Sequence, residues 1–215
     1  MKSKNVFAEG EIFHVFNKSI ANFPILKDLD NTKRFMQTLG YYNSSFNKMN
    51  LGNFLQENHD YDSDILLPVE GTFVKYLSYC LMPDHYHLLI KILIDRKFSK
   101  YISDVENSFS RYFNIRFKRK GPLWQSRFKA VRIKTNEQLL HVSRYIHLNP
   151  TTANLVKKPE DWIYSSYKKI ISDPKYLREI LTEISIKESA SYKKFVENNI
   201  DYQRKLAIIK KLLLD

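Results

Sequence analysis

The sequence predicts an α+β fold in which helices pack on an antiparallel sheet. Stretches typical of strands and helices follow one another in the order strand, helix, strand, strand, helix, strand, helix. Hydrophobic residues make up 43% of the chain and aromatic residues 14%, which is typical of a globular protein rather than a disordered one. A chain of 215 residues is also long enough to bury a substantial core.

The N-terminal part contains one predicted strand and one predicted helix. Residues 11–20 alternate weakly between apolar and polar side chains and predict a strand. Residues 28–42 predict a helix with Asp30 as its candidate N-cap. Residues 43–64 are polar, and we expect a loop or an insertion there.

The central part predicts two strands and a long helix. Residues 72–82 are rich in aromatic and branched side chains, which favours a buried strand. The Pro83-Asp84 step breaks this run, and residues 86–94 predict a second strand. Apolar residues at 98, 102, 105, 109 and 113 have the spacing of one helix face, so residues 98–117 predict a helix.

The C-terminal part begins with residues 118–133, which form a basic turn centred on Gly121-Pro122 and lead into a predicted strand. Residues 135–150 predict a helix because Thr135 and Gln138 have the spacing of a capping box. Pro150 disfavours helix before it and predicts an end near Leu148 or Asn149. From residue 173 onward the pattern is mainly helical. We expect one main domain over residues 1–170 and a helical extension over residues 171–215.

The charge of the chain predicts a polyanionic partner. Lysine and arginine number 35 against 23 acidic residues, which gives a formal net charge of +12. From Asn107 to Asn136 there is no acidic residue at all. The basic residues in that window are Arg111, Arg116, Lys118, Arg119, Lys120, Arg127, Lys129, Arg132 and Lys134. A local basic surface of this kind most often binds nucleic acid.

The composition excludes some classes of protein. With one cysteine, Cys80, the chain cannot form an internal disulfide or a zinc site built on several thiolates. No apolar run reaches the length of a membrane span, and the first residues lack the apolar core of a secretory signal. We therefore expect a cytoplasmic protein that does not enter a membrane.

Two histidines in the second central strand are candidate metal ligands. Residues two apart on a strand point to the same face, so His85 and His87 project together and Tyr86 and Leu88 point the other way. Two imidazoles on one rigid face are a plausible half of a metal site. An isolated pair of this kind is more often part of a core or surface, so a third ligand is needed to favour metal binding.

The helix over residues 135–150 offers that ligand and a nucleophile. Tyr145 and Asn149 are four residues apart and lie on one helix face. If this face meets the histidine strand, Asn149 can supply an amide oxygen to the metal, and Tyr145 can act as a covalent nucleophile. Packing is the alternative role for Tyr145, one of 14 tyrosines. The nearby Arg144, His141 and His147 are expected at the surface or as phosphate partners.

Three motifs in this order carry a resemblance to a known family. The segments YCLMPDHYHLLI, GPLWQSRFKAVRI and SRYIHLNPTTANLV resemble those of the REP-associated tyrosine transposases, which belong to the HUH class of single-strand DNA nucleases. FHVFNKSI and DWIYSSYKKI extend the resemblance over most of residues 11–170. Asp84 stands where the family commonly has Asn or Glu, and residues 43–64 look longer than in typical members.

The resemblance implies an HUH endonuclease fold with a ferredoxin-like palm and a catalytic domain over residues 1–170. It implies that His85 and His87 are the metal pair, Asn149 the third ligand and Tyr145 the single nucleophile. The metal would be Mg²⁺ or Mn²⁺, and the product a 5′-phosphotyrosine link. The partner would be single-stranded DNA, with hairpin-forming repeats as its expected targets, and a homodimer is one option that the sequence does not decide.

The acid-free window predicts where DNA binds outside the catalytic group. Basic residues neutralise phosphates, and aromatic residues between them stack unpaired bases. The expected DNA contacts are Arg111, Arg116, Arg119, Lys120, Trp124, Arg127, Lys129 and Arg132, although a role in packing is a strong alternative for Trp124.

Three other functions remain open. A relaxase or replication initiator of the same class is disfavoured, since the nucleophilic tyrosine of a relaxase lies near the N-terminus, before the histidine motif, and the first tyrosine here is only Tyr41. A nucleic-acid-binding protein that has lost catalysis would keep the fold without the reaction. A hydrolytic metallonuclease would cut DNA without a covalent step and would tolerate loss of the Tyr145 hydroxyl.

Overall fold

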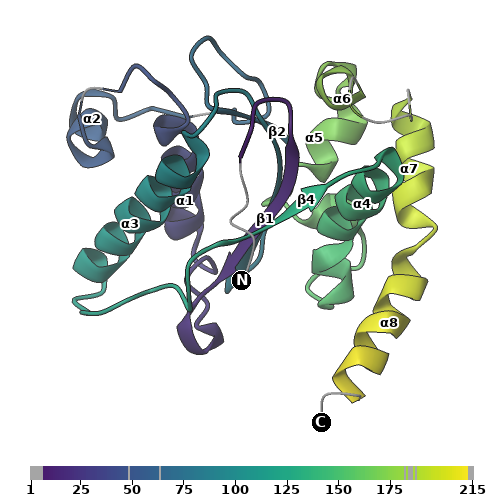
Figure 1. Cartoon of the computed structure of the whole chain (residues 1–215). Helices are drawn as coiled ribbons and strands as arrows, with labels where there is room; N and C mark the ends of the chain where they lie inside the picture. Colours follow the sequence, from purple (N-terminus) through teal and green to yellow (C-terminus); the bar gives the residue numbers. More distant parts are fainter. Residues whose placement is uncertain are drawn as a thin grey trace, which may run out of the picture.

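A four-stranded antiparallel sheet with helices packed on it confirms the predicted fold class (Figure 1). The computed structural model describes residues 7–47, 49–62, 64–181, 183, 186 and 188–212. The strand order is β2-β3-β1-β4, and each neighbouring pair is antiparallel. The strands are β1 (Ile12–Lys18), β2 (Val74–Leu81), β3 (His85–Ile92) and β4 (Lys129–Ile133).

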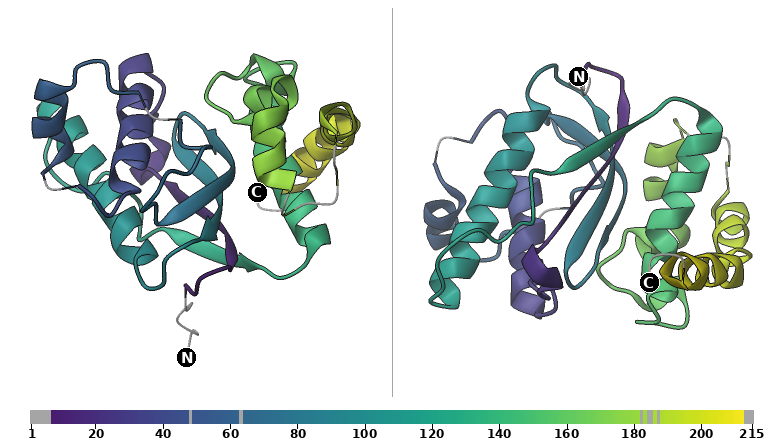
Figure 2. Two further views of the ribbon diagram at one scale, coloured as in Figure 1. Left: turned by 90° about the horizontal axis from the view of Figure 1, so that it is seen from above. Right: turned by 60° about the horizontal axis from the view of Figure 1, so that its bottom comes forward.

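Helices lie on both faces of this sheet, as the view from above in Figure 2 shows. The longer ones are α1 (Leu29–Tyr42), α3 (Phe98–Arg116), α4 (Asn136–Thr152) and α8 (Ile200–Leu212). The shorter ones are α2 (Leu51–Glu57), α5 (Tyr167–Ser172), α6 (Pro174–Leu181) and α7 (Ser189–Glu197), with 3-10 turns at Ile20–Asn22 and Pro159–Asp161.

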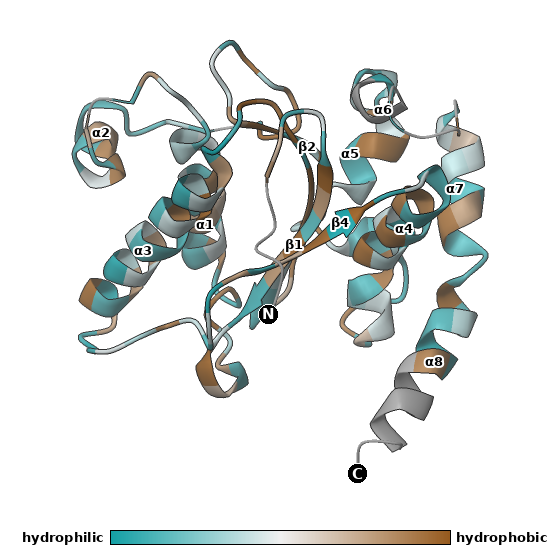
Figure 3. Ribbon diagram, in the orientation of Figure 1, coloured by the Kyte–Doolittle hydropathy of each residue, from teal (hydrophilic) through white to brown (hydrophobic). Residues whose placement is uncertain are grey.

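The two faces of the sheet bury separate apolar clusters. On one face Phe13 of β1 and Tyr86 of β3 are covered by α1 and α3, with Phe109 among the buried contacts. On the other face Leu89 of β3 is covered by Ile146 of α4 and by the helices that follow it. Strands β2 and β3 therefore carry buried apolar residues on both faces, and Figure 3 shows much of β1 and β2 in brown while part of β4 is teal. Removing both faces from water is the main force that holds the three layers together.

The helix face predicted for α3 is confirmed, because residues 98, 102, 105, 109 and 113 are all buried. Two helix ends differ from prediction. The N-cap of α1 is Asp28, whose carboxylate accepts a hydrogen bond from the Asn31 backbone at 3.1 Å, and Asp30 lies in the first turn instead. The polar stretch of residues 43–64 is not only loop, since it contains α2.

The end of α4 also differs from prediction, because the helix runs through Pro150 to Thr152. Proline removes one backbone donor and crowds the preceding turn. Here that loss falls in the last turn, where Ala153 and Leu155 donate to the carbonyls of Asn149 and Pro150 at 2.9 and 3.0 Å. The capping box at the other end is confirmed: Thr135 Oγ1 accepts from Gln138 N, and Gln138 Oε1 accepts from Lys134 N.

The mainly helical pattern predicted after residue 173 is confirmed by α6, α7 and α8, while residues 182, 184, 185, 187 and 213–215 lie outside the described part of the chain. Helices α7 and α8 pack against α4, whereas α6 packs against α5 and β2. Arg204 Nε of α8 donates to the Thr151 carbonyl at 2.9 Å, and Tyr192 Oη of α7 lies 2.9 Å from His147 Nδ1. Within the described residues, no helix is both long and apolar enough to cross a membrane.

Candidate active site

The register of β1 and β3 sets which side chains share the face beneath α4. Phe16 of β1 pairs with His87 and Lys18 pairs with His85, while Tyr86 points to the opposite face and is buried there. The two histidines therefore project together, as their spacing predicts. Their rings lie edge to face with centroids 5.0 Å apart.

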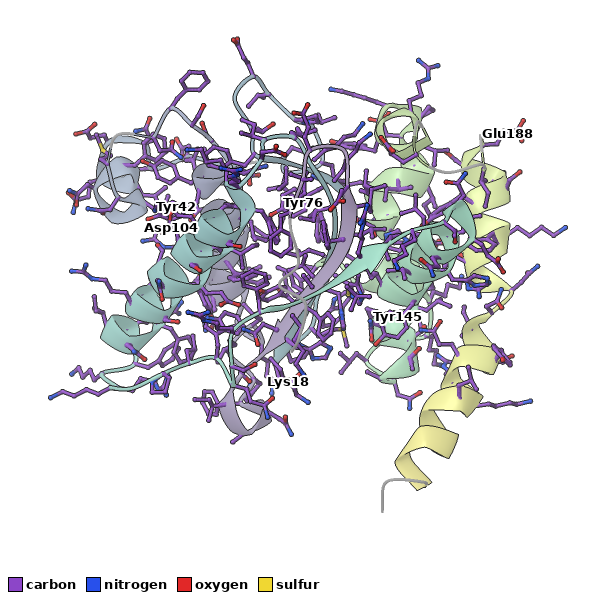
Figure 4. All side chains as sticks on the ribbon, in the orientation of Figure 1. Lys18, Tyr42, Tyr76, Asp104, Tyr145 and Glu188 are labelled. Carbon is purple, nitrogen blue, oxygen red and sulfur yellow. The ribbon has the colours of Figure 1, made fainter. Side chains whose placement is uncertain are left out.

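Helix α4 brings Tyr145 to this pair. The Tyr145 ring meets His87 edge-on with centroids 5.5 Å apart. Figure 4 labels Tyr145 on the α4 side of the sheet. A cavity of about 260 Å³ opens beside these residues, and Tyr145 is 40% exposed. The cavity is lined by Phe16, Asn17, Lys18, His85, His87, Gln125, Ser126, Lys129 and Tyr145.

Both histidines have the same ring nitrogen engaged by a neighbour. His85 Nδ1 lies 2.6 Å from Asp84 Oδ1, and His87 Nδ1 lies 2.9 Å from His14 Nε2. Histidines that bind metals typically use one nitrogen for the metal and hold the other by a hydrogen bond, which fixes the tautomer. The arrangement therefore leaves Nε2 of each ring as the candidate ligand atom.

The charge states of these groups fit the same role. Burial, reinforced by His85 and His14, lowers the pKa of His87 well below its ordinary value, so the ring is neutral and able to bind a cation. Burial tends to raise the pKa of the Asp84 carboxyl, but the bond to His85 and the charge of Lys18 lower it overall. Asp84 is thus an ionised acceptor behind His85.

Sequence reasoning missed His14. It belongs to β1, alternates with Phe16 and Lys18 on the site face, and burial lowers its pKa to about 4. The alternation over residues 11–20 was a usable signal for its direction. Its contact with His87 depends on the β1–β3 register, which joins segments 73 residues apart.

Asn149 lies one helical turn from Tyr145 and is 8% exposed. Its amide Nδ2 is buried without a hydrogen-bond partner, and the residue does not line the cavity. Burial raises the pKa of the Tyr145 phenol, and the neighbouring Asn149 amide offsets part of that rise. Tyr145 is therefore protonated at neutral pH when no cation is near it.

The residues present fit a divalent cation by their chemistry. The imidazole nitrogens of His85 and His87 and the side-chain oxygen of Asn149 are a mixed nitrogen and oxygen donor set, which would leave positions for phosphate and water. Among the described residues no group of three or more His, Cys, Asp or Glu side chains is arranged to hold a metal.

The predicted DNA contacts divide into three groups. Lys129 lines the cavity, and Lys120, Arg127 and Arg111 are exposed. Others are already paired within the chain. Arg119 donates to Asn114 and to the Pro122 carbonyl, Arg116 pairs with Asp28 and Asp30 at 3.3 and 3.1 Å, and Arg132 pairs with Glu11 at 2.5 Å.

Two expectations need correction. Trp124 is 9% exposed, packs against Phe35 and Tyr86, and donates through Nε1 to the Glu106 carbonyl at 3.3 Å. Its ring therefore belongs to the core and has little surface on which a base could stack.

His147 is fully buried rather than at the surface. Its ring nitrogens contact Ser166 Oγ and Tyr192 Oη, both at 2.9 Å, which brace α4. His141 is exposed as expected, while Arg144 lies 2.7 Å from it, is half-buried and stacks over the Phe195 ring of α7.

Comparisons with known proteins show that part of this chain is similar to transposases. Residues 69–149 match the family model described as "Transposase IS200 like". A Haemophilus influenzae protein named as a candidate REP-associated tyrosine transposase is 28% identical over 103 residues, which cover 43% of this chain. The match spans only 58% of that protein's length.

A solved structure shows a similar fold. It is described as a REP-associated tyrosine transposase bound to a REP hairpin, and it aligns with a TM-score of 0.56 at 14% identity. The alignment covers 80% of this chain and 86% of the other. The stretch of residues 69–149 that matches the family model contains the histidine pair, Tyr145 and Asn149.

Proposed function

We propose that this chain is a metal-dependent transposase and endonuclease of single-stranded DNA that cuts and rejoins strands through a 5′-phosphotyrosine. The observation that carries the proposal is the edge contact of Tyr145 with His87 beside an open cavity. A phenol, two oriented imidazoles and a lysine meet there within one chain, and a nucleophile beside a phosphate-binding group is what a strand transfer needs.

The phenol oxygen of Tyr145 attacks the scissile phosphorus. The bond from phosphorus to the 3′ oxygen breaks, the phenol loses its proton, and the leaving oxygen gains one to become a 3′-OH. The DNA 5′ phosphate is then esterified to Tyr145. Attack by a second 3′-OH reverses the step and joins a new strand, so the exchange needs no external energy source.

His85 and His87 would hold the cation through Nε2, with Asn149 as the amide ligand. A bound Mg²⁺ or Mn²⁺ supplies charge that stabilises the phosphate oxygens and favours loss of the phenol proton. Lys129 and Lys18 line the same cavity and would neutralise phosphates next to the cut. His14 and Asp84 would keep the two rings turned toward the cation.

The substrate follows from charge and from relatives. The acid-free window supplies basic groups on the surface around the cavity, and the solved relative is described as bound to a REP hairpin. We infer that the substrate is a hairpin with single-stranded flanks. The catalytic domain would extend over residues 1–170, with residues 171–215 as a helical extension that braces α4.

The test is a covalent-adduct assay. The protein is incubated with Mn²⁺ and labelled hairpin-bearing single-stranded DNAs, and an SDS-resistant adduct is sought. We expect an adduct that needs metal and is lost in Tyr145→Phe and in His87→Ala. Tyr202→Phe is the matched control, because Tyr202 is 61% exposed on α8. Cleavage that survives in Tyr145→Phe without an adduct would instead identify a hydrolytic nuclease.

A further inference from the structure

A groove of about 830 Å³ lies along the outer side of α3, away from Tyr145. Figure 4 labels Tyr42 and Asp104, which both line it, beside α2 and α3, on the opposite side of the sheet from Tyr145. Its volume is within the range of about 300–1,000 Å³ typical of ligand sites. One wall comes from α2, which lies inside the polar stretch of residues 43–64.

The positive charges in the groove are incompletely matched. Lys100 pairs with Asp104 at 2.6 Å, and Arg116 pairs with Asp28 and Asp30. Arg34 and Arg111 also line the groove, and among the described residues neither has a carboxylate within ion-pair distance. Two unmatched guanidinium groups favour an anion, and Arg binds phosphate in a bidentate way.

Arg34 is held in a defined position. Its guanidinium lies over the Tyr112 ring, 5.0 Å from the ring centroid, and is half-buried. Burial removes water from the Arg34 guanidinium and therefore lowers its pKa. The neighbouring Tyr112 and Tyr42 offset part of this effect and so favour the charged form. Tyr112 Oη in turn accepts from Arg116 at 2.7 Å. This stack is a fixed positive wall rather than a mobile surface side chain.

The rest of the lining suits bases rather than phosphate alone. Amide side chains of Asn50, Asn53, Gln56 and Asn107 can pair with base edges. Ile115, which is 70% exposed, and Tyr42 offer apolar contact. A groove that combines arginines, aromatic rings and amides resembles the platforms that bind unpaired nucleotides.

The groove and the candidate active site are joined by one segment of the chain. The acid-free window from Asn107 to Asn136 lines the groove at its start, through Arg111 and Arg116, and the catalytic cavity further on, through Gln125 and Lys129. A strand that follows this window can therefore touch both places. The groove extends over residues 100–116 of α3, about 24 Å at 1.5 Å per residue, which is room for several nucleotides.

We propose that the α2–α3 groove is a second DNA site, which holds a single-stranded segment several nucleotides away from the scissile phosphate. The proposal rests on the proposed function for the identity of the polynucleotide. Arg34 and Arg111 contact its phosphates, and the wall from α2 contacts its bases. The groove thus adds affinity for longer substrates without taking part in the chemistry.

The experiment compares two oligonucleotides by fluorescence anisotropy at several salt concentrations. The short one carries the hairpin and the cleavage site, and the long one adds a single-stranded extension on one side or the other. The variants are Arg34→Gln with Arg111→Gln, and Asn53→Glu, which places a carboxylate on the α2 wall. Arg178→Gln, exposed on α6 across the sheet, is the matched control.

We expect the double variant to bind the long DNA about tenfold more weakly and to lose about 1.4 from the magnitude of the logarithmic salt slope, because each phosphate contact of a single strand contributes about 0.7. Asn53→Glu should also weaken binding of the long DNA. This variant keeps the Arg34–Tyr112 stack, so it remains informative if loss of that stack prevents folding. Arg178→Gln should change neither value.

Unchanged affinity and slope in both variants would overturn the proposal. So would an equal loss for short and long DNA, since the arginines would then serve the cleavage-site segment. The Tyr145 adduct with saturating short DNA is measured in parallel. If binding depends on the groove but the wild type forms no adduct, the proposed reaction is wrong and the proposed second DNA site still stands.

Discussion

At the scale of single residues, the candidate site depends on which ring nitrogen each histidine presents. Asp84 and His14 hold the two Nδ1 atoms, so the orientation of the rings is set before any cation binds. The neutral state that burial gives His87 removes the need to expel a proton first. In metalloproteins generally, mutation of a residue that holds a metal-binding histidine by a hydrogen bond lowers metal affinity roughly 10- to 100-fold.

His14→Ala should therefore weaken Mn²⁺ binding by at least about tenfold while leaving the fold intact. The measurement is the free Mn²⁺ signal in electron paramagnetic resonance during titration of the DNA-free protein. His14→Gln, which returns an acceptor oxygen, should recover part of the affinity. His59→Ala is the control, because His59 is exposed in the loop after α2. Equal affinity in wild type and His14→Ala would remove His14 from the site.

At the scale of elements, one buried carboxylate ties α3 to the sheet. Glu106 Oε1 accepts from Asn17 Nδ2 of β1 and from Tyr86 Oη of β3, both at 2.7 Å. Asn17 also donates to the Ser126 carbonyl at 2.9 Å, in the loop that leads to β4. These hydrogen bonds thus hold β1 and β3, the strands that carry His14 and His87, against helix α3 on the opposite face of the sheet.

Glu106 also predicts a pH dependence of stability. Burial raises its pKa, and the bonds from Asn17 and Tyr86 only partly oppose this. The folded state therefore holds the proton more tightly than the unfolded state. The wild type should lose stability relative to Glu106→Gln as pH rises from the unfolded value near 4.3 through the raised folded value.

Urea unfolding at pH 4 to 8 measures this difference. Glutamine keeps the accepting oxygen, so both bonds survive in the variant. The difference in free energy of unfolding between the two proteins should be smallest at pH 4. Toward pH 8 the Glu106→Gln variant should become increasingly the more stable of the two. Glu57→Gln, exposed on α2, serves as the control and should give no such trend. A gap that is flat with pH, or that grows in favour of the wild type, would contradict the prediction.

The elements also show what the sequence could and could not predict. Local periodicity correctly predicted the buried face of α3 and the common direction of His85 and His87, because both follow from backbone geometry. The passage of α4 through Pro150 depends on how the last turn is closed and packed, which no local rule contains. His147 lies inside only because α5 and α7 supply Ser166 and Tyr192, which are distant in sequence.

At the scale of the whole molecule, β3 and α4 of the same chain bring His87 and Tyr145 together. The strand lies at the centre of the sheet and the helix lies on its face, so no second copy is needed to complete this pair. The sequence could not decide this point, because a helix can pack on its own sheet or on that of a partner.

A mixture of His87→Ala and Tyr145→Phe chains should therefore show no adduct, although each variant carries the residue that the other lacks. The measurement is the covalent-adduct assay at rising total protein, with a mixture of wild type and Tyr145→Phe as the positive control. Restored adduct in the mixture of the two variants would show that partners exchange α4 and share sites.

The two edges of the sheet face different surroundings. Backbone groups of β2 bond to residues 164–166, so that edge is covered. Strand β4 lies at the end of the strand order of the described residues, and it carries the exposed Lys129 and Arg132, of which Arg132 pairs with Glu11. Positive charge on an outer strand repels the same strand of another copy and hinders strand-to-strand aggregation. Lys129, which also lines the cavity, would thus protect the chain against self-association at high concentration, and a polyanion that neutralises it would weaken that protection.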